Sequence, residues 1–285
     1  MTAIRRYLRR LLQPGKVRIP LPAHFAASRT LILSSDQGRD QIAMELAAHG
    51  WNSFEHPVPD VVSSLAQVTD GSFFDVGANS GLYALLSASA SKQVKIHAFE
   101  PYPPAIDALL RNIALNDLVQ RITLCRSALG DKAGRQSLYI PLQDHGLLES
   151  SASLNAGFKT EHSRVLDIDA TTIDDYVLES ATIRLGLLKI DVESTEHQVL
   201  AGGMETIGRD RPLIVLEVLH LADHAWLDTF CRQNNYRIFT LHPQHIQTRD
   251  SVAFHGDAWN QCFCPEEKLS VLFSCAEKIG IQFHD

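Results

Sequence analysis

The sequence lacks several features that would each define a class of protein. No run of 18 apolar residues occurs, so nothing in it predicts a membrane-spanning helix. The five cysteines are few, odd in number and scattered, which argues against a disulfide framework and favours a reducing compartment, the cytoplasm. No internal repeat or low-complexity tract is visible. With 285 residues and 45% apolar content, the chain is typical of one large α/β domain, or of one domain with an appendage.

Basic residues are scarce outside the first 18 positions. The chain has 26 Lys and Arg against 33 Asp and Glu, a net charge of −7. Six of the basic residues and none of the acidic ones lie within residues 1–18, which leaves 20 to face all 33 acidic side chains. This acidic balance argues against a nucleic-acid partner.

The basic N-terminal segment has the pattern of an amphipathic helix. Its apolar stripe, with arginines opposite, consists of Ile4, Tyr7, Leu8, Leu11 and Leu12. The long apolar core and small-residue cleavage site of a signal peptide are missing. Such a helix suits a weak peripheral contact of residues 1–18 with an anionic membrane. The alternative, which we favour, is a helix docked on the acidic body of the protein itself.

Composition divides the chain into three parts. Residues 1–66 are rich in proline and too poor in apolar residues for a separate core, so we expect an N-terminal extension with a basic amphipathic helix. Residues 67–265 alternate short apolar runs with segments of helical spacing, which predicts βαβ units and a parallel sheet. In such a sheet, ligands bind at the carboxyl ends of the strands. Residues 266–285 are expected to form a C-terminal helix.

The most informative segment is FFDVGANSGL, residues 73–82, where a strand runs into small residues before a helix begins. Gly77 and Gly81 permit a tight turn and a close approach of a ligand to the backbone. The N–H groups at the start of a helix suit a carboxylate or a phosphate. Alone, this turn is weak evidence, because glycine also ends strands for purely geometric reasons.

Glu100 strengthens the interpretation of this turn as a cofactor site. It follows Gly81 by 19 residues, at the end of the next strand, where a Rossmann-type fold binds the ribose hydroxyls of a nucleoside cofactor. The turn reads D-x-G-A-N-x-G instead of G-x-G-x-x-G, and Asp75 would be badly placed beside a pyrophosphate. A carboxylate there suits S-adenosyl-L-methionine (SAM), which carries an ammonium group and a sulfonium. The pattern indicates methyl transfer and disfavours an NAD-dependent oxidoreductase.

On these motifs the sequence resembles the FkbM-type family of class I SAM-dependent methyltransferases. Matching segments in family order over about residues 70–265 include FFDVGANSGLYAL, HAFEPYPPAIDALLRNIALNDL, SALGDKAG and LLKIDVESTEHQVLAGG. One departure is Ser194-Thr195, where the family more often has glycine and alanine. The resemblance implies a Rossmann-like fold, with a seven-stranded, mostly parallel sheet and helices on both faces. Its late antiparallel strand would be Trp259–Cys264.

The resemblance also implies which residues bind SAM, from its methionine end to its adenine. They are Asp75, Gly77, Asn79 and Gly81 at the methionine end, Glu100 at the ribose, and Pro101 or Tyr102, Ser127 and Ala128 around the adenine.

Three residues at strand ends are candidates for the chemistry. Asp191 lies near the end of the apolar run 185–192, where an idle charge would be costly, and it also counts among the cofactor-binding residues. Glu217 and His220 lie at the carboxyl end of the predicted strand 213–218. An alcohol acceptor must lose a proton during methyl transfer, so each of the three is a candidate base.

No metal site is expected from residue spacing. The close pairs His220/His224 and His242/His245 have no cysteine or glutamate beside them at the spacing of a zinc site. A loosely held Mg²⁺ at Asp191 stays open, because such an ion needs few protein ligands.

The sequence therefore predicts a cytoplasmic SAM-dependent O-methyltransferase that acts on a hydroxyl. The resemblance implies a small-molecule or glycan acceptor, such as a sugar of a surface polysaccharide or glycolipid, or a natural product. The alternatives are an N-methyltransferase of the same fold and a non-catalytic SAM-binding or interaction module.

Overall fold

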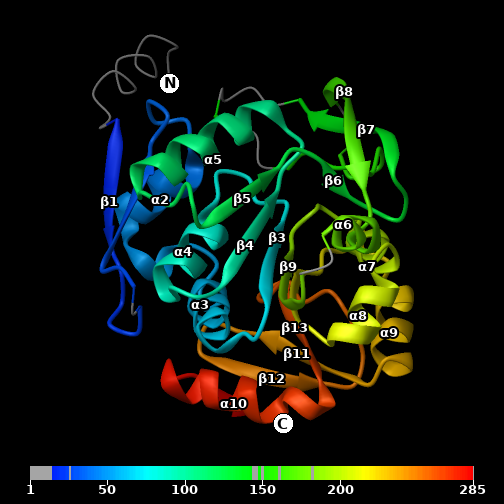
Figure 1. Cartoon of the computed structure of the whole chain (residues 1–285). Coiled ribbons are helices and arrows are strands. Elements are labelled where there is room, and N and C mark those ends of the chain that lie inside the picture. Colours follow the sequence, from blue (N-terminus) through cyan, green and yellow to red (C-terminus); the bar gives the residue numbers. More distant parts are fainter. Residues whose placement is uncertain are drawn as a thin grey trace.

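The computed structural model describes residues 15–25, 27–142, 147–148, 151–159, 162–180 and 183–284. Most of the predicted basic amphipathic helix, residues 1–14, lies outside these ranges. Within them the chain forms one nine-stranded sheet, two small sheets, and helices on both faces of the large sheet (Figure 1). Across the described ranges, every helix is too short or too polar to traverse a bilayer.

The large sheet confirms the expected Rossmann-like fold. Its strand order is β14-β12-β11-β13-β10-β9-β3-β4-β5. The bounds of its strands are β3 Ser72–Val76, β4 Lys95–Phe99, β5 Ile122–Cys125, β9 Leu185–Ile190, β10 Leu213–Glu217, β11 Tyr236–Leu241, β12 His245–Arg249, β13 Asn260–Pro265 and β14 Gln282–His284. Strands β5, β4, β3, β9 and β10 pair in parallel, and β13 runs antiparallel between β10 and β11. The predicted antiparallel strand is therefore present.

The sheet has nine strands where the resemblance implies seven. Strand β12 pairs antiparallel with β11, and β14 adds in parallel to β12 at the edge. The last part of the chain is accordingly a helix, α10 (Leu269–Lys278), followed by a strand. Two smaller sheets complete the strands: β1 (Lys16–Pro20) with β2 (Thr30–Ser34), and β6 (Ala128–Leu129), β8 (His162–Thr171) and β7 (Gly134–Pro141).

Helices cover the two faces of the large sheet in two groups (Figure 1). Their bounds are α2 Gln41–His49, α3 Val58–Val68, α4 Leu82–Ala90, α5 Pro103–Leu115, α6 Ile173–Glu179, α7 Glu196–Ala201, α8 Met204–Asp210 and α9 His224–Gln233. Helices α3, α4, α5 and α10 share one core cluster, and α6 to α9 share another. Adjacent residues of β3 point to opposite faces, with Phe73 in the first cluster and Phe74 in the second.

The N-terminal extension packs on the body of the protein. Val17 and Ile19 of β1, Leu31 of β2 and Leu65 of α3 all belong to the core cluster that also contains α4 and α5. Fully buried Asn112 of α5 accepts a hydrogen bond from the backbone N–H of Ser34 at 2.7 Å and donates one to the carbonyl of Ser80 at 2.8 Å. The extension and the turn before α4 are therefore bound to the same side chain.

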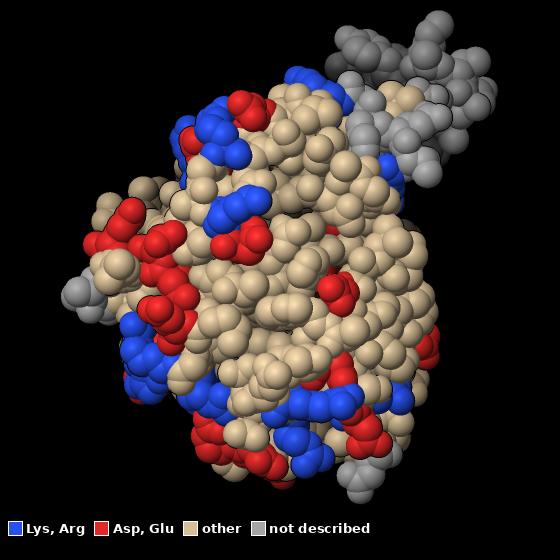
Figure 2. All heavy atoms as spheres, turned by 90° about the vertical axis from the view of Figure 1, so that its right-hand side faces the viewer, with Lys and Arg blue, Asp and Glu red and all other residues tan. Residues whose placement is uncertain are grey.

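Figure 2 views the face on the right-hand side of Figure 1, where α8 and α9 lie. Its lysine and arginine side chains lie mostly next to acidic ones, and much of its middle is uncharged. Ion pairs on these helices fit this picture, with Arg209 beside Asp210 in α8 and Arg232 beside Asp228 in α9.

We predict that Asn112→Ala lowers the free energy of unfolding by about 2–4 kcal/mol, because it leaves two buried backbone groups without a partner. Half-buried Asn116 makes a similar pair of bonds to the backbone of Ile32, so Asn116→Ala is the graded comparison and should cost less. Denaturant unfolding of both variants measures the difference. Equal stability of Asn112→Ala and the parent chain would contradict this account of the extension.

Candidate active site

Strand pairing brings the candidate residues together. The last residue of β3, Val76, pairs with Phe99 of β4 and Ile190 of β9, and Ile190 pairs with Leu216 of β10. Because these strands are parallel, the residues that follow meet at one edge of the sheet. Four of them line a single cleft: Gly77, Glu100, Asp191 and Glu217.

Two glycines shape the turn after β3. Gly77 has φ +78°, and a Cβ there would lie 1.8 Å from the backbone oxygen of Asp191. The N–H groups of Gly77 and Ala78 each donate to the carbonyl of Phe99 at 3.0 Å, so three strand ends are in backbone contact. Gly81 has φ +95°, and a Cβ there would meet Leu109 of α5 at 2.2 Å. Gly77 thus allows the turns after β3 and β9 to touch, whereas Gly81 allows α4 to pack on α5.

Glu100 is held in place by the backbone. Its two carboxylate oxygens accept hydrogen bonds from the N–H groups of Asn79 and Tyr102, both at 2.8 Å. Only 6% of the residue is exposed, and burial raises the pKa of Glu100 to about 7, against these two bonds. Each oxygen keeps a lone pair that can accept a bond from a ligand hydroxyl.

The predicted cofactor residues divide into two groups. Those that line the cleft are Gly77, Asn79, Glu100, Pro101, Tyr102, Ala128 and Asp191. Asp75, Gly81 and Ser127 are not among its lining residues. Asp75 is buried, and its carboxylate accepts the N–H of Ala84 in the first turn of α4 at 2.8 Å. Burial raises the pKa of Asp75 to about 7, although the charge of Lys189 and this N–H oppose the rise. Asp75 therefore joins the end of β3 to α4.

A buried lysine lies beside the candidate base. The Lys189 side chain is 1% exposed, and its Nζ lies 3.4 Å from Oδ2 of Asp191, which is 28% exposed. The same ammonium stands 5.0 Å from the ring centre of Tyr83, in cation–π contact. Burial alone would lower the pKa of Lys189. The neighbouring carboxylates, Asp191 above all, outweigh this effect, so the pKa lies above its usual value. Lys189 and Asp191 form an ion pair at the cleft, in which Asp191 lines the cleft and Lys189 is buried beneath it.

Three carboxyl groups crowd this centre. Asp191, Glu193 and Glu217 each offer an oxygen within 4.8 Å of the others. Burial, and then the charge of Asp191, raises the pKa of Glu193 to about 8 and that of Glu217 to about 10. Both shifts favour the protonated form of the glutamate, which is able to donate a hydrogen bond, whereas Asp191 is the partner of Lys189.

His220 is not brought into the cleft. Strand β10 ends at Glu217, and His220 lies exposed in the turn that follows, with its ring 6.0 Å from that of Phe254. Of the three candidate bases, the structure brings Asp191 and Glu217 together and leaves His220 outside.

Sequence reasoning missed several side chains that form the cleft. Phe54 and Glu55 of the N-terminal extension line it, and Oε2 of Glu55 accepts a hydrogen bond from the hydroxyl of Tyr83. The sequence does contain a sign that Lys189 belongs to the site. It lies inside an apolar strand, and a lysine is rarely fully buried unless it is paired with an acidic group. No signal in the sequence pointed to Glu55, because its position depends on how the extension folds back.

Comparison with known proteins gives a family for this arrangement. The model of the methyltransferase FkbM domain matches residues 75–239. The chain is 30% identical over 154 residues to the 31-O-demethyl-FK506 methyltransferase FkbM of Streptomyces tacrolimicus, which covers 45% of this chain and 58% of that protein. It is 25% identical over 159 residues to the 2-O-methyltransferase NoeI of Sinorhizobium fredii, which covers 53% of this chain and 64% of that protein. The chain thus spans less than two thirds of the length of either relative.

Among solved structures, the chain is similar to the methyltransferase FkbM of Methylobacillus flagellatus KT. That match has 18% identity and a TM-score of 0.45, and covers 68% of this chain and 43% of that one. The family model itself covers more than half of the chain, from the end of β3 into β11. The protein therefore belongs to the FkbM methyltransferase family.

Proposed function

We propose that the protein is a SAM-dependent O-methyltransferase that acts on a hydroxyl of a sugar, a glycan or a natural product. The observation that carries this proposal is one cleft at the carboxyl ends of parallel strands, lined by both Glu100 and Asp191. The first suits the ribose of a nucleoside cofactor, and the second suits a hydroxyl that must lose a proton.

The residues present fit SAM. Glycine at position 77 lets the turn after β3 lie against the backbone of Asp191, which brings the residues of both turns to one cleft. Oδ1 of Asn79 is buried without a hydrogen-bond partner, so it is available to a donor such as an ammonium group. Glu100 would hold the ribose hydroxyls, and Pro101, Tyr102 and Ala128 would border the adenine. When bound, SAM supplies a methyl group already activated for transfer by its sulfonium.

Asp191 is the residue we assign to the proton. Methyl transfer to an alcohol forms a C–O bond, breaks the C–S bond and releases the hydroxyl proton, which the Asp191 carboxylate would accept. Glu217 holds a proton at neutral pH and would donate a hydrogen bond to the acceptor oxygen instead of acting as the base. Lys189 would keep the Asp191 carboxylate oriented through its 3.4 Å contact. Alignment of the acceptor and exclusion of water are then the main tasks of the cleft.

The names of two relatives support oxygen over nitrogen as the acceptor atom. One is a 31-O-demethyl-FK506 methyltransferase and the other is a 2-O-methyltransferase. An amine acceptor would also fit an acidic cleft, so N-methylation, and SAM binding without any transfer, are outcomes that the experiments below distinguish.

A role for Mg²⁺ is the alternative to direct proton transfer. The oxygens of Asp191, Glu193 and Glu217 are the hard ligands that Mg²⁺ takes. The Lys189 ammonium beside Asp191 already supplies a positive charge there, which favours the metal-free proposal.

The first prediction for the active site concerns Glu100 and the pH dependence of SAM binding. The raised pKa of Glu100 means that its carboxylate, the form that accepts ribose hydroxyls, is lost as the pH falls through about 7. SAM affinity of the parent chain should therefore fall between pH 8 and pH 6. Glu100→Gln should weaken SAM by about 1–3 kcal/mol at pH 8 and should flatten this pH dependence. Titration calorimetry at several pH values measures both effects.

Glu193→Gln is the matched control for this prediction. It removes another glutamate of raised pKa from the same cleft, away from the two backbone N–H groups that hold Glu100. The control should keep most of the pH dependence. A Glu100→Gln variant that binds SAM as tightly as the parent at pH 8 would exclude Glu100 from the cofactor site.

The second prediction concerns Asp191 in catalysis. Asp191→Asn keeps the shape of the side chain but cannot accept the proton, so turnover should fall about 10²–10⁴-fold while SAM affinity changes little. A deletion strain that carries either the parent gene or the variant gene is the assay. Mass spectrometry of its cell-envelope glycans and metabolites then reports the lost methyl group and whether it sat on oxygen or on nitrogen.

Asp250→Asn, at an exposed carboxylate outside the cleft, is the control and should restore the methyl group fully. Full restoration by Asp191→Asn would remove Asp191 from the mechanism. Loss of activity of the purified parent chain in EDTA, with recovery only on added Mg²⁺, would make Asp191 a metal ligand instead of the base.

A further inference from the structure

We propose that Glu55 of the N-terminal extension binds the acceptor, and that this acceptor is a neutral polyhydroxylated ring and not a phosphorylated or carboxylated compound. This inference rests on the proposed methyl transfer to a hydroxyl. It adds the chemical class of the acceptor and a residue that selects it.

The charged residues that line the cleft indicate which class of acceptor it can bind. Its lining includes six acidic residues and, within the described part of the chain, no lysine, arginine or histidine. Lys189 is buried in contact with Asp191 and is not a lining residue. A phosphate or carboxylate on the acceptor would lie among carboxyl groups, and none of the described residues that line the cleft offers a cationic side chain to pair with it, which is unfavourable. A hydroxyl both donates and accepts hydrogen bonds and carries no charge, so it can bind among carboxyl groups without a cation.

Glu55 lies at the part of the cleft that holds the candidate base. Its charge interacts with Lys189 and Asp191, and its Oε2 accepts a hydrogen bond from Tyr83, the same residue whose ring meets the Lys189 ammonium. Among the residues that the structure describes, none donates a hydrogen bond to Oε1 of Glu55. This oxygen is therefore available to a ligand hydroxyl. Phe54, next in the chain, lines the cleft as well and offers a flat apolar surface on which the C–H face of a ring can rest.

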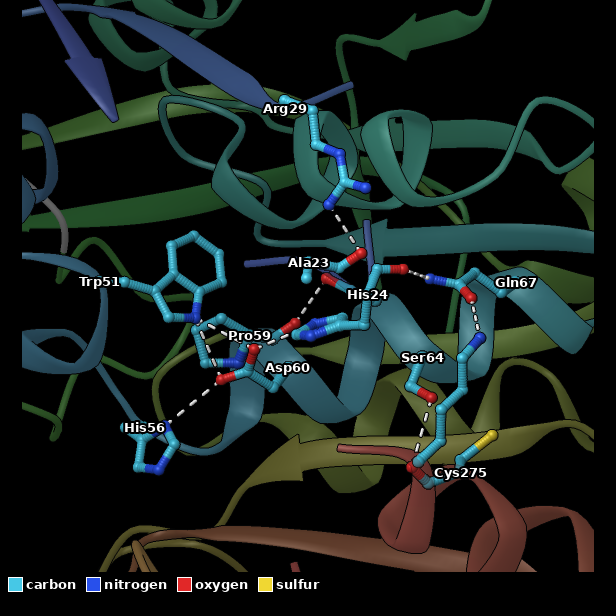
Figure 3. Close-up of polar contacts among 12 residues, drawn as sticks. Ala23, His24, Arg29, Trp51, His56, Pro59, Asp60, Ser64, Gln67 and Cys275 are labelled. Atoms are coloured by element: carbon cyan, nitrogen blue, oxygen red, sulfur yellow. Dashed lines mark hydrogen bonds and ion pairs between the residues drawn. The ribbon is translucent and has the colours of Figure 1, made fainter. Parts of the chain in front are cut away.

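The segment that carries Glu55 is held in place by contacts with Asp60 of α3. Figure 3 shows Trp51, His56 and His24 around the carboxylate of Asp60 in α3. Trp51 donates to both oxygens of Asp60, at 3.0 and 3.1 Å, and ring nitrogens of His24 and His56 lie 3.1 and 3.3 Å from them.

Trp51 and His56 lie on either side of residues 52–55 in the chain, so these two anchors restrict where Phe54 and Glu55 can lie. Glu55 itself has φ +47°, a left-handed conformation that is uncommon for a residue with a side chain. Its carbonyl accepts the N–H of Val58 at 2.8 Å, which closes the turn. The position of Glu55 in the cleft is therefore set by the fold and is ready for a ligand.

The test measures binding to the full chain in the presence of S-adenosylhomocysteine, the demethylated cofactor. The probes are the methyl glycosides of glucose, galactose and mannose, each paired with its hexose 1-phosphate, and saturation-transfer NMR gives their Kd values. We expect at least one methyl glycoside to bind at least tenfold more tightly than its phosphate. Glu55→Gln should weaken that glycoside at least fivefold and leave the affinity for S-adenosylhomocysteine unchanged.

Two further variants make the result specific. Glu55→Asp keeps a carboxylate and should bind the glycoside more tightly than Glu55→Gln. Glu45→Gln removes a partly exposed carboxylate of α2 that does not line the cleft, and it should behave as the parent chain. An unchanged melting temperature of Glu55→Gln shows that a loss of binding is not a loss of fold.

A hexose 1-phosphate that binds as tightly as its glycoside, or no glycoside binding at all, overturns the proposed acceptor class. Unchanged glycoside affinity in Glu55→Gln overturns the assignment of Glu55. Failure of the proposed function has a different signature, because the parent chain would then not bind S-adenosylhomocysteine, or deletion of the gene would remove no methyl group from the cell.

Discussion

Parallel pairing of β4, β3, β9 and β10 is the constraint on which the rest of the site depends. These parallel strands are in register and end at the same edge of the sheet, so the residues that follow them lie close together. The contact is close enough that a Cβ at position 77 would overlap the carbonyl of Asp191. Glycine at this position therefore allows the two strand ends to touch and also brings Asp191 to the cleft. A larger residue there would push the Asp191 backbone away and would disturb the cofactor side and the acceptor side together.

The same edge concentrates carboxyl groups around one buried ammonium. Burial raises the pKa of Glu193 to about 8 and of Glu217 to about 10, which favours their protonated forms, and Lys189 faces Asp191. A carboxyl whose pKa is higher in the folded than in the unfolded protein stabilises the fold at low pH, and this stabilisation is lost as the pH rises through the folded value. The cleft therefore becomes more costly to maintain toward alkaline pH, which is typical of a site kept for function and not for stability.

How far the sequence predicts this structure depends on how local each signal is. The glycine turn after β3, Glu100 at the end of β4 and Asp191 after β9 are each set by a strand and the turn that follows, and all three line one cleft. Strands β12, β14 and β8 are not expected from the sequence, because they are short or polar and owe their existence to pairing with a neighbouring strand. His220 follows its strand by a further three residues, enough for the chain to turn away from the edge. Ser194, where the resemblance leads us to expect glycine, has φ +76°, so a residue with a side chain adopts a conformation that favours glycine.

Glu55 illustrates the kind of residue that no local signal identifies. The family model begins at residue 75, so the extension that carries Phe54 and Glu55 lies outside the matched domain, whereas Gly77, Glu100 and Asp191 lie within it. On the proposals above, the shared domain holds the cofactor and the base, and a segment outside it supplies one wall of the acceptor side. Such a division lets the acceptor change while the strand ends that align the methyl transfer stay fixed, because loops and appendages tolerate change more readily than a packed sheet. On the same proposals, the selectivity of this protein depends on the contacts of Asp60 with Trp51 and His56. These contacts hold the segment that carries Phe54 and Glu55 against α3.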